Sequence, residues 1–271
     1  IACDGGDIGA MQSLASIYGN GRGVKKNAEE AKRLEVEISK RVLEQSEGMK
    51  WKRDGGIKWG FDERIRRLVI RGKDPFEDYA EGGKTCQVKN YGWSMNEWPE
   101  WRLKYEEQIE SVVICYGVAS VGSFSFYDCK NIKSLILPST IRQICSEAFF
   151  ACCSLESLVI PNGLKVIAGN AFQGCCSVRS IFFPESVLSF DSNPFVWWSS
   201  LKSIEVAQES LYLQVVDGVL FDKGMHKLIS FGTCTKSVYE IPNTVTSIGY
   251  QAFHDCKRLT SVVIPDSITS I

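Results

Sequence analysis

Cysteine and histidine are the side chains in this chain best suited to chemistry, and their spacing argues against a chemical role. The chain has 11 cysteines and 2 histidines in 271 residues. The pairs Cys152–Cys153 and Cys175–Cys176 suggest zinc, but no Cys-x-x-Cys spacing accompanies them. His226 and His254 have no nucleophile at a recognisable motif spacing, and no Gly-x-Ser-x-Gly or glycine-rich phosphate loop occurs. We therefore expect no catalytic residues, no metal site, no cofactor and no small-molecule substrate.

The cysteines instead follow a repeat. Cys129, Cys152 and Cys175 are spaced 23 residues apart, and Cys256 falls in the same column. A position that is cysteine in several repeats indicates a small buried side chain, so we predict buried thiols there. Strands stacked about 5 Å apart leave disulfides between Cys129 and Cys152, or between Cys152 and Cys175, as an alternative. The cysteines alone therefore leave the redox compartment open.

A 23-residue period runs from Ile109 to Ile271. In each copy a short strand with alternating inward residues is ended by a turn, and a later phenylalanine fills the middle of the coil. A fixed period of this length predicts a solenoid, in which each repeat buries its apolar face only against its neighbours. A solenoid offers a long surface and usually no pocket, which favours binding. The phenylalanine column consists of Phe126, Phe149, Phe172, Phe195 and Phe253.

The repeat resembles the BspA-type leucine-rich repeat, with the form L-x-S-I-x-I-P-x-x-V-x-x-I-G-x-x-A-F-x-x-C. The best copy is residues 236–258, KSVYEIPNTVTSIGYQAFHDCKR. An insertion at about 207–235 also fits that family, and its Asp217-Gly218 pair predicts a hairpin turn. The resemblance implies a parallel β-sheet over 109–271. It also implies surface proteins that bind host proteins, matrix proteins or partner cells, so a cell-surface or secreted location is favoured.

Residues 1–47 predict a pair of helices. Asp7 and Asn27 are placed as N-caps, and the glycines between residues 19 and 23 end the first helix. This segment resembles a Sel-one-like repeat, a relative of the tetratricopeptide repeat, through Y-x-x-G-x-G-V. Since the chain starts at Ile1 and stops within a repeat, we interpret it as a fragment. The fold class is thus an α+β repeat protein, with a helical hairpin repeat preceding a leucine-rich-repeat solenoid.

Residues 48–108 lack the period and are interpreted as a linker and a tryptophan-rich N-terminal cap. A solenoid needs such a cap to cover the apolar edge of its first repeat. Trp98-Pro99-Glu100-Trp101 is the segment expected to cover it. An aromatic cage for a ligand is the alternative. The tryptophans are Trp51, Trp59, Trp93, Trp98 and Trp101.

Outward positions of the strands are the candidate partner-binding site. One column places apolar side chains on successive strands, which predicts an exposed stripe of the kind found at interaction sites. The alternative is that β-branched residues simply favour strands. A second column alternates in charge, as in a ladder that fixes register or as in a partner-facing rim. The candidates are Val113, Ile136, Val159 and Phe182 in the first column, Glu156 and Arg179 in the second, and Trp197, which either binds a partner or packs beside the insertion.

Composition excludes several partners. A net charge of −1 without a basic stripe does not suggest nucleic acid. No apolar run approaches the roughly 18 residues needed to span a bilayer. We therefore expect a non-enzymatic module that binds other proteins through the open sheet face. The alternatives are an intracellular scaffold in which both repeat types assemble partners, and a regulatory segment of a larger enzyme.

Overall fold

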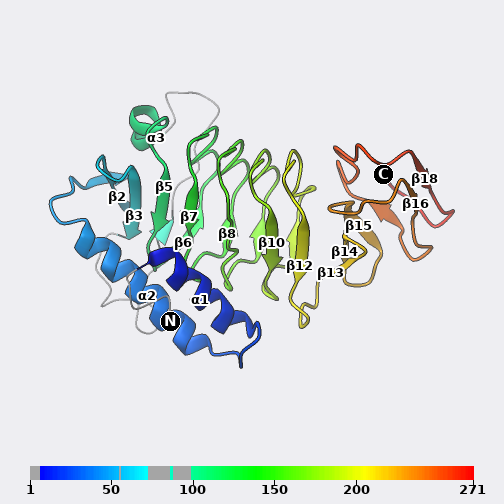
Figure 1. The fold of residues 1–271 in the computed structure, drawn as a ribbon, viewed down its shortest axis with the longest axis horizontal. Coiled ribbons are helices and arrows are strands. Elements are labelled where there is room, and N and C mark those ends of the chain that lie inside the picture. The colour runs from blue at the N-terminus through cyan, green and yellow to red at the C-terminus, as the bar shows by residue number, and fades with distance from the viewer. Residues whose placement is uncertain (1–6, 55, 73–85, 88–98) are drawn as a thin grey trace.

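The computed structural model describes residues 7–54, 56–72, 86–87 and 99–271. These residues form an elongated stack of coils, with two helices lying along its N-terminal half (Figure 1). The helices are α1, Ile8–Asn20, and α2, Ala28–Gln45. A short third helix, α3, spans Glu100–Tyr105 and precedes the first coil.

The predicted caps of α1 and α2 are confirmed. The Asp7 carboxylate accepts hydrogen bonds from the amides of Gly9 and Ala10, and the Asn27 side chain accepts one from Glu30. Gly21 ends α1 in the left-handed region at φ 70°, where glycine meets no steric penalty. The two helices pack side by side and form the helical pair.

Parallel strands of successive coils form the sheet that the period predicts. Equivalent residues pair in register one repeat apart, as Val113 does with Ile136 and Ile181 with Ile204. Before the first coil, β1 to β3 form an antiparallel extension, and β3 pairs in parallel with β5. The sequence predicts a linker and a cap for residues 48–108 and does not indicate these strands. The strands are β1 Lys52–Asp54, β2 Ile57–Asp62, β3 Arg67–Gly72, β5 Ser111–Ile114, β7 Ser134–Ile136, β10 Ser180–Phe183, β12 Ser203–Val206, β16 Val238–Glu240 and β18 Ser261–Val263.

A strand predicted within residues 155–160 is absent. The turn before it still docks on the preceding coil, through the amide of Glu156 and the carbonyl of Lys133. The strand hydrogen bonds do not continue from there, so the sheet is interrupted between β7 and β10. Leu158 and Ile160 nevertheless point inward and are buried, as predicted. The coil therefore keeps its inward burial here without the strand hydrogen bonds of its neighbours.

A second row of short strands, not foreseen from the sequence, follows the turn of each coil. Its order is β11-β9-β8-β6-β4, all parallel. Val121, Ile144 and Ile167 pair here one repeat apart and face the core. The strands are β4 Cys86–Gln87, β6 Val118–Val121, β8 Gln143–Ile144, β9 Val166–Ile167 and β11 Ser189–Phe190.

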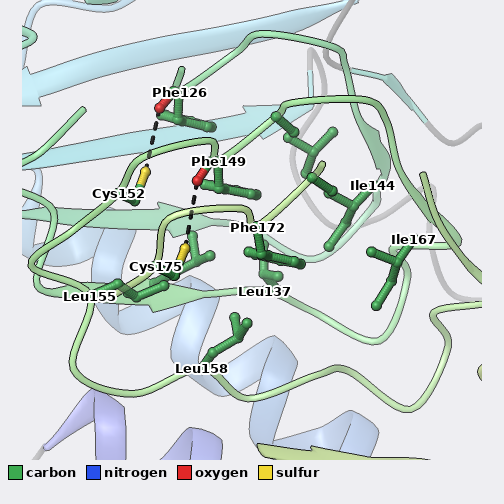
Figure 2. Close-up of a cluster of buried hydrophobic side chains, with 14 of the residues drawn as sticks. Phe126, Leu137, Ile144, Phe149, Cys152, Leu155, Leu158, Ile167, Phe172 and Cys175 are labelled. Carbon is green, nitrogen blue, oxygen red and sulfur yellow. Dashed lines mark hydrogen bonds between the residues drawn. The ribbon is translucent and has the colours of Figure 1, made fainter. Parts of the chain in front are cut away.

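The core is a column of stacked aromatic rings between the two rows of strands. Phe126, Phe149 and Phe172 lie with ring centroids 5.0 and 5.3 Å apart and nearly parallel planes (Figure 2). Beside them the thiols of Cys152 and Cys175 donate to the carbonyls of Phe126 and Phe149 at 3.4 and 3.6 Å. Each coil is therefore fixed to the previous one by a ring and by a thiol.

The cysteine column is buried as predicted at three of its four positions, whereas Cys256 is partly exposed. Its thiols are free, so the alternative disulfides Cys129–Cys152 and Cys152–Cys175 are not formed. Burial raises the pKa of Cys152 well above its ordinary value, because a thiolate there would lack solvation. These thiols are therefore packing groups and not nucleophiles.

Trp101 on α3 covers the first coil. Its buried ring lies 5.6 Å from Trp59 of β2 and 6.3 Å from Phe126. Because Trp59 and Trp101 are both buried, they serve the core and do not form an open aromatic cage. Trp93 and Trp98 lie outside the described residues.

The insertion forms the predicted hairpin. β13, Leu213–Val216, and β14, Val219–Asp222, are antiparallel around Asp217-Gly218. A second turn leads to β15, Lys227–Ser230, which pairs in parallel with β17, Ser247–Ile248. The insertion thus replaces one coil, and the regular repeat resumes after it.

Candidate functional site

The outward apolar column predicted from the sequence forms a row of side chains on successive coils. This open-face row consists of Val69, Val113, Ile136, Val159, Phe182 and Glu205. Strand register aligns Val69 with Val113, Val113 with Ile136, and Phe182 with Glu205. The row therefore runs along the stack on the side away from the phenylalanine core.

The helical pair covers the beginning of this row, which corrects the expectation that Val113 is exposed. Val113 is only 2% exposed and packs with Val69 against the apolar faces of both helices. Ile136 is half-buried at the edge of the same cluster. The reason is that the apolar stripes of both helices need a partner, and the β-branched row supplies one. Those stripes are Ile8, Met11 and Ala15 of α1 and Leu34, Ile38 and Val42 of α2.

Polar contacts attach α2 to the coils. Glu35 is 9% exposed and accepts a hydrogen bond from the Ser139 amide at 2.9 Å and another from its hydroxyl. Burial raises the pKa of Glu35 to about 7, although the Ser139 hydrogen bonds and Arg142 oppose the shift. The hydroxyl of Ser39 accepts from the amide of Tyr116 at 2.9 Å. Both helix side chains therefore accept hydrogen bonds from turn amides of the coils.

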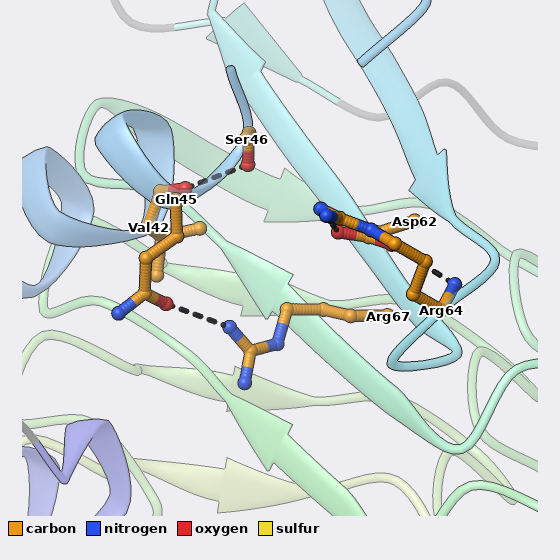
Figure 3. Close-up of polar contacts among 6 residues, drawn as sticks. All are labelled: Val42, Gln45, Ser46, Asp62, Arg64 and Arg67. Carbon is orange, nitrogen blue, oxygen red and sulfur yellow. Dashed lines mark hydrogen bonds and ion pairs between the residues drawn. The ribbon is translucent and has the colours of Figure 1, made fainter. Parts of the chain in front are cut away.

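At the far end of α2, the side-chain oxygen of Gln45 accepts from Arg67 of β3 at 3.2 Å (Figure 3). In the same region Arg64 pairs with Asp62 at 2.9 Å, and the Ser46 hydroxyl donates to the carbonyl of Val42. The Arg64 hydrogen bond and charge lower the pKa of Asp62. Of these contacts, the hydrogen bond between Gln45 and Arg67 joins the helical pair to the sheet extension.

The loop between α1 and α2 reaches further along the row. The guanidinium of Arg22 lies 4.4 Å from the centre of the Phe182 ring and pairs with Glu205 at 2.7 Å. Lys26 of the same loop pairs with Glu185. Exposed ion pairs are typically worth about 0–1 kcal/mol each, so this end of the contact is weak beside the apolar burial at Val113.

The charged column forms a ladder only at its first rungs. Glu110 accepts from Lys133 at 2.7 Å and also pairs with Arg66, and these partners lower the pKa of Glu110. Glu156 and Arg179 are exposed, and neither makes an ion pair within the described part of the chain. Those two charges therefore lie beside the half-buried Val159 and Phe182 without an ion-pair partner among the described residues.

Trp197 lies apart from the open-face row. It is 45% exposed with φ 63°, and its ring contacts Phe150 and His254 edge-on, each at 6.1 Å. It therefore spans from the second repeat to the repeat after the insertion. The structure does not bring it together with the six other candidates.

Sequence reasoning missed the residues that occupy the open face. The apolar face of α2 was recognised, but nothing in the pattern said where that face packs. Arg22 and Glu35 carried no motif signal, since each becomes meaningful only beside a coil far along the chain. Across the residues described, no cluster of three or more metal-ligating side chains occurs, and no helix is long and apolar enough to cross a membrane.

Stacked coils with in-register parallel strands and a buried phenylalanine column define a leucine-rich-repeat solenoid. The chain belongs to the BspA-type leucine-rich repeat family, of which six copies match residues 103–215 and 229–271. Proteins of this kind are typically protein-interaction modules and are generally non-enzymatic. No curated protein matches the chain.

Two solved structures show the same fold. A leucine-rich repeat protein from Eubacterium ventriosum is 20% identical, with a TM-score of 0.61 over 80% of this chain and 60% of that chain. The pneumococcal vaccine antigen PcpA is 16% identical, with a TM-score of 0.52 over 81% of this chain and 71% of that chain. The chain thus spans less than two thirds of the length of the Eubacterium protein. Likeness at these identities shows the fold alone.

Proposed function

We propose that this chain is a non-enzymatic module that binds another protein through the open face, in adhesion to a host or partner cell. The observation that carries the proposal is the central patch, which consists of Glu156, Val159, Arg179 and Phe182. It combines two unpaired charges with two half-buried apolar side chains on neighbouring coils.

The composition of the central patch fits a partner-binding surface. Interfaces combine apolar contact area with a polar rim, and arginine and aromatic residues are enriched in them. A structural ladder would pair Glu156 and Arg179 as it pairs Glu110 and Lys133, and that pairing is missing. A partner that supplies the opposite charges is therefore the simplest use of the patch.

A surface location supports adhesion over other kinds of binding. The fold is shared with a pneumococcal protein described as a vaccine antigen, and an antigen that serves as a vaccine is accessible from outside the cell. We extend that location to this chain as part of the proposal. Trp197 is an additional candidate contact, because its exposed ring is of the kind that anchors interfaces.

Charge reversal tests the proposal. The double variant Glu156→Lys with Arg179→Glu keeps the net charge but inverts the patch. Its matched control is Glu209→Lys with Lys223→Glu, two exposed positions of the insertion that also keep the net charge. A partner would be captured with the wild-type chain from cell-surface extracts, purified, and titrated against each protein. We expect affinity to fall about tenfold or more with the double variant, since mispaired charges oppose docking. Unchanged affinity in a folded double variant would remove the central patch as the site.

An intracellular scaffold is the second candidate. The observation that favours it is that nine cysteines of the described residues are free thiols, which suits a reducing compartment. In that case both the helical pair and the coils would contact partners. Locating the full-length protein in fractionated cells distinguishes the two candidates.

A further inference from the structure

Cys153 and Cys176 form a pair that neither the fold nor the proposed function uses. They follow the buried column cysteines directly, one repeat apart, and both are partly exposed. The Cys176 thiol lies 3.9 Å from the Cys153 sulfur. Because no third ligand joins them among the described residues, the zinc site once suggested by these doublets has no support.

We propose that Cys153 and Cys176 are a redox-modification site, which a small disulfide oxidant converts into a disulfide linking two successive coils. The oxidant class is a low-molecular-weight disulfide such as oxidised glutathione. The proposal is independent of the proposed function, because it needs only the two coils and solvent access.

The backbone holds the two thiols in equivalent positions. Ahead of each cysteine the chain turns through a left-handed residue, Ala151 at φ 56° and Gly174 at φ 80°. In both turns the cysteine amide donates to the carbonyl two residues back at 2.8 Å. The Ser177 hydroxyl also donates to the Cys153 carbonyl at 2.6 Å, which fixes one coil on the other. The two sulfurs therefore stay neighbours without motion of the backbone.

Close approach of the coils at this point makes a bond feasible. A Cβ built on Gly174 would lie 3.1 Å from the Ala151 Cα, so the two turns are in direct contact. Forming a disulfide shortens the sulfur separation to about 2.05 Å, which the turning of two side chains can supply. The column thiols of Cys152 and Cys175 donate to carbonyls in the core and are buried away from an oxidant. The Cys176 thiol also donates to a carbonyl, that of Gly174 at 3.2 Å, but it is partly exposed.

The reaction is an ordinary thiol–disulfide exchange. The Cys176 thiolate attacks a sulfur of oxidised glutathione, which forms a mixed disulfide and releases one glutathione thiolate. Cys153 reacts second, because burial and the neighbouring Cys176 raise its pKa. The Cys153 thiolate then attacks the protein-bound sulfur and releases the second glutathione. The protein loses two electrons, the oxidant gains them, and the two thiol protons pass to the released glutathione thiolates. The second step is intramolecular, so the cross-link should exceed the mixed disulfide.

Peptide mapping tests the site. Trypsin separates residues 143–165, which hold Cys145, Cys152 and Cys153, from residues 166–179, which hold Cys175 and Cys176. We expect the folded wild-type chain treated with oxidised glutathione to yield these two peptides linked by a disulfide. Treatment of the folded chain with dithiothreitol should separate them. Cys153→Ser should lower the joined peptide by more than about tenfold and leave glutathione on Cys176. The matched control Cys152→Ser should retain the cross-link.

Two further measurements keep the outcome decisive. Circular dichroism confirms that each variant folds, and thermal denaturation should show a higher midpoint for oxidised than for reduced wild type but not for Cys153→Ser. Stable glutathione adducts on wild type without joined peptides would overturn the proposal. So would a cross-link that survives Cys153→Ser, since it would then belong to Cys152 and Cys175 or to Cys145.

Discussion

Where the helical pair meets the coils, single residues contribute hydrogen bonds and charge in addition to apolar packing. Glu35 is the clearest example, because a carboxyl group is buried against the Ser139 turn and not left in water. Arg142 and Tyr116 are the other titratable groups with electrostatic influence there. The helical attachment is therefore sensitive to the protonation of one side chain.

The pKa of Glu35 predicts a pH-dependent stability. Its folded value of about 7 lies above the ordinary 4.5, so the folded state holds the proton more tightly. The contribution of the protonated form is fully present below about pH 4.5 and is lost as pH rises through about 7. Glu35→Gln should remove this dependence and, at pH 8, raise the free energy of unfolding by on the order of 1–3 kcal/mol.

The measurement for Glu35 is urea denaturation between pH 5 and 8, with the helical signal followed by circular dichroism. Glu44→Gln, at an exposed position of the same helix, is the control and should behave as the wild type. Equal slopes of stability against pH in wild type and Glu35→Gln would contradict the assignment.

Elements in this protein differ in how far the sequence determines them. The strands of the open face were largely predictable because the period places each inward residue in a column, and Val113 and Ile136 pair as that period requires. The second row of strands was not. The caps at Asp7 and Asn27 were predictable because capping is local. The position of the helical pair was not, since an amphipathic helix shows that it needs an apolar partner but not which one.

The absent strand at residues 155–160 illustrates a second limit on what the sequence predicts. Its residue pattern matches the neighbouring repeats, and inward burial follows the pattern. Hydrogen bonding between coils depends on small shifts of the backbone that side-chain periodicity does not encode. The site prediction failed at Val113 for a related reason, because exposure depends on what packs over a sheet and not on the sheet.

The helical pair should detach without loss of the solenoid. Its contact with the open-face row is a separate apolar cluster from the phenylalanine core. Ile38→Asp places an unpaired charge in that cluster, at a cost of several kcal/mol. Amide hydrogen exchange should then show loss of protection over residues 8–45, while coils such as 118–144 keep theirs.

Lys40→Asp is the matched control for Ile38→Asp. Lys40 is exposed on the same helix, and the substitution introduces the same carboxylate. It should leave exchange over both regions close to that of the wild type. Loss of protection throughout the coils of Ile38→Asp would show instead that the solenoid needs the helical pair in order to fold.

At the scale of the whole molecule, the coils contain two cores that meet at the insertion. The phenylalanine column continues to Phe195, whereas a second apolar cluster around Phe231 holds the coils after the insertion. The outward strands β10–β12 and β16–β18 form separate pairs, so no strand ladder on the open face crosses this point. In a linear array, stability is set by contacts between neighbours, and a weak neighbour contact becomes a boundary for unfolding.

Asn193 is the polar link across that boundary. It is buried, its side-chain nitrogen donates to the carbonyl of Gln251 at 2.7 Å, and its side-chain oxygen accepts from the amide of Phe195 at 2.9 Å. Its own amide donates to the carbonyl of Tyr250. One side chain therefore orients the turn of the fourth repeat and holds the repeat that follows the insertion.

Asn193→Ala should therefore uncouple the two cores. It leaves the Gln251 carbonyl and the Phe195 amide without partners, at about 1–3 kcal/mol for each buried group. Hydrogen exchange in increasing urea should show residues 219–263 losing protection at lower urea than residues 118–190, with a wider gap than in wild type. Asn131→Ala, which removes an exposed hydrogen bond to the Glu107 carbonyl, is the control and should leave the gap unchanged. A single transition in Asn193→Ala, shifted as a whole, would show that the coils on both sides of the insertion unfold as one unit.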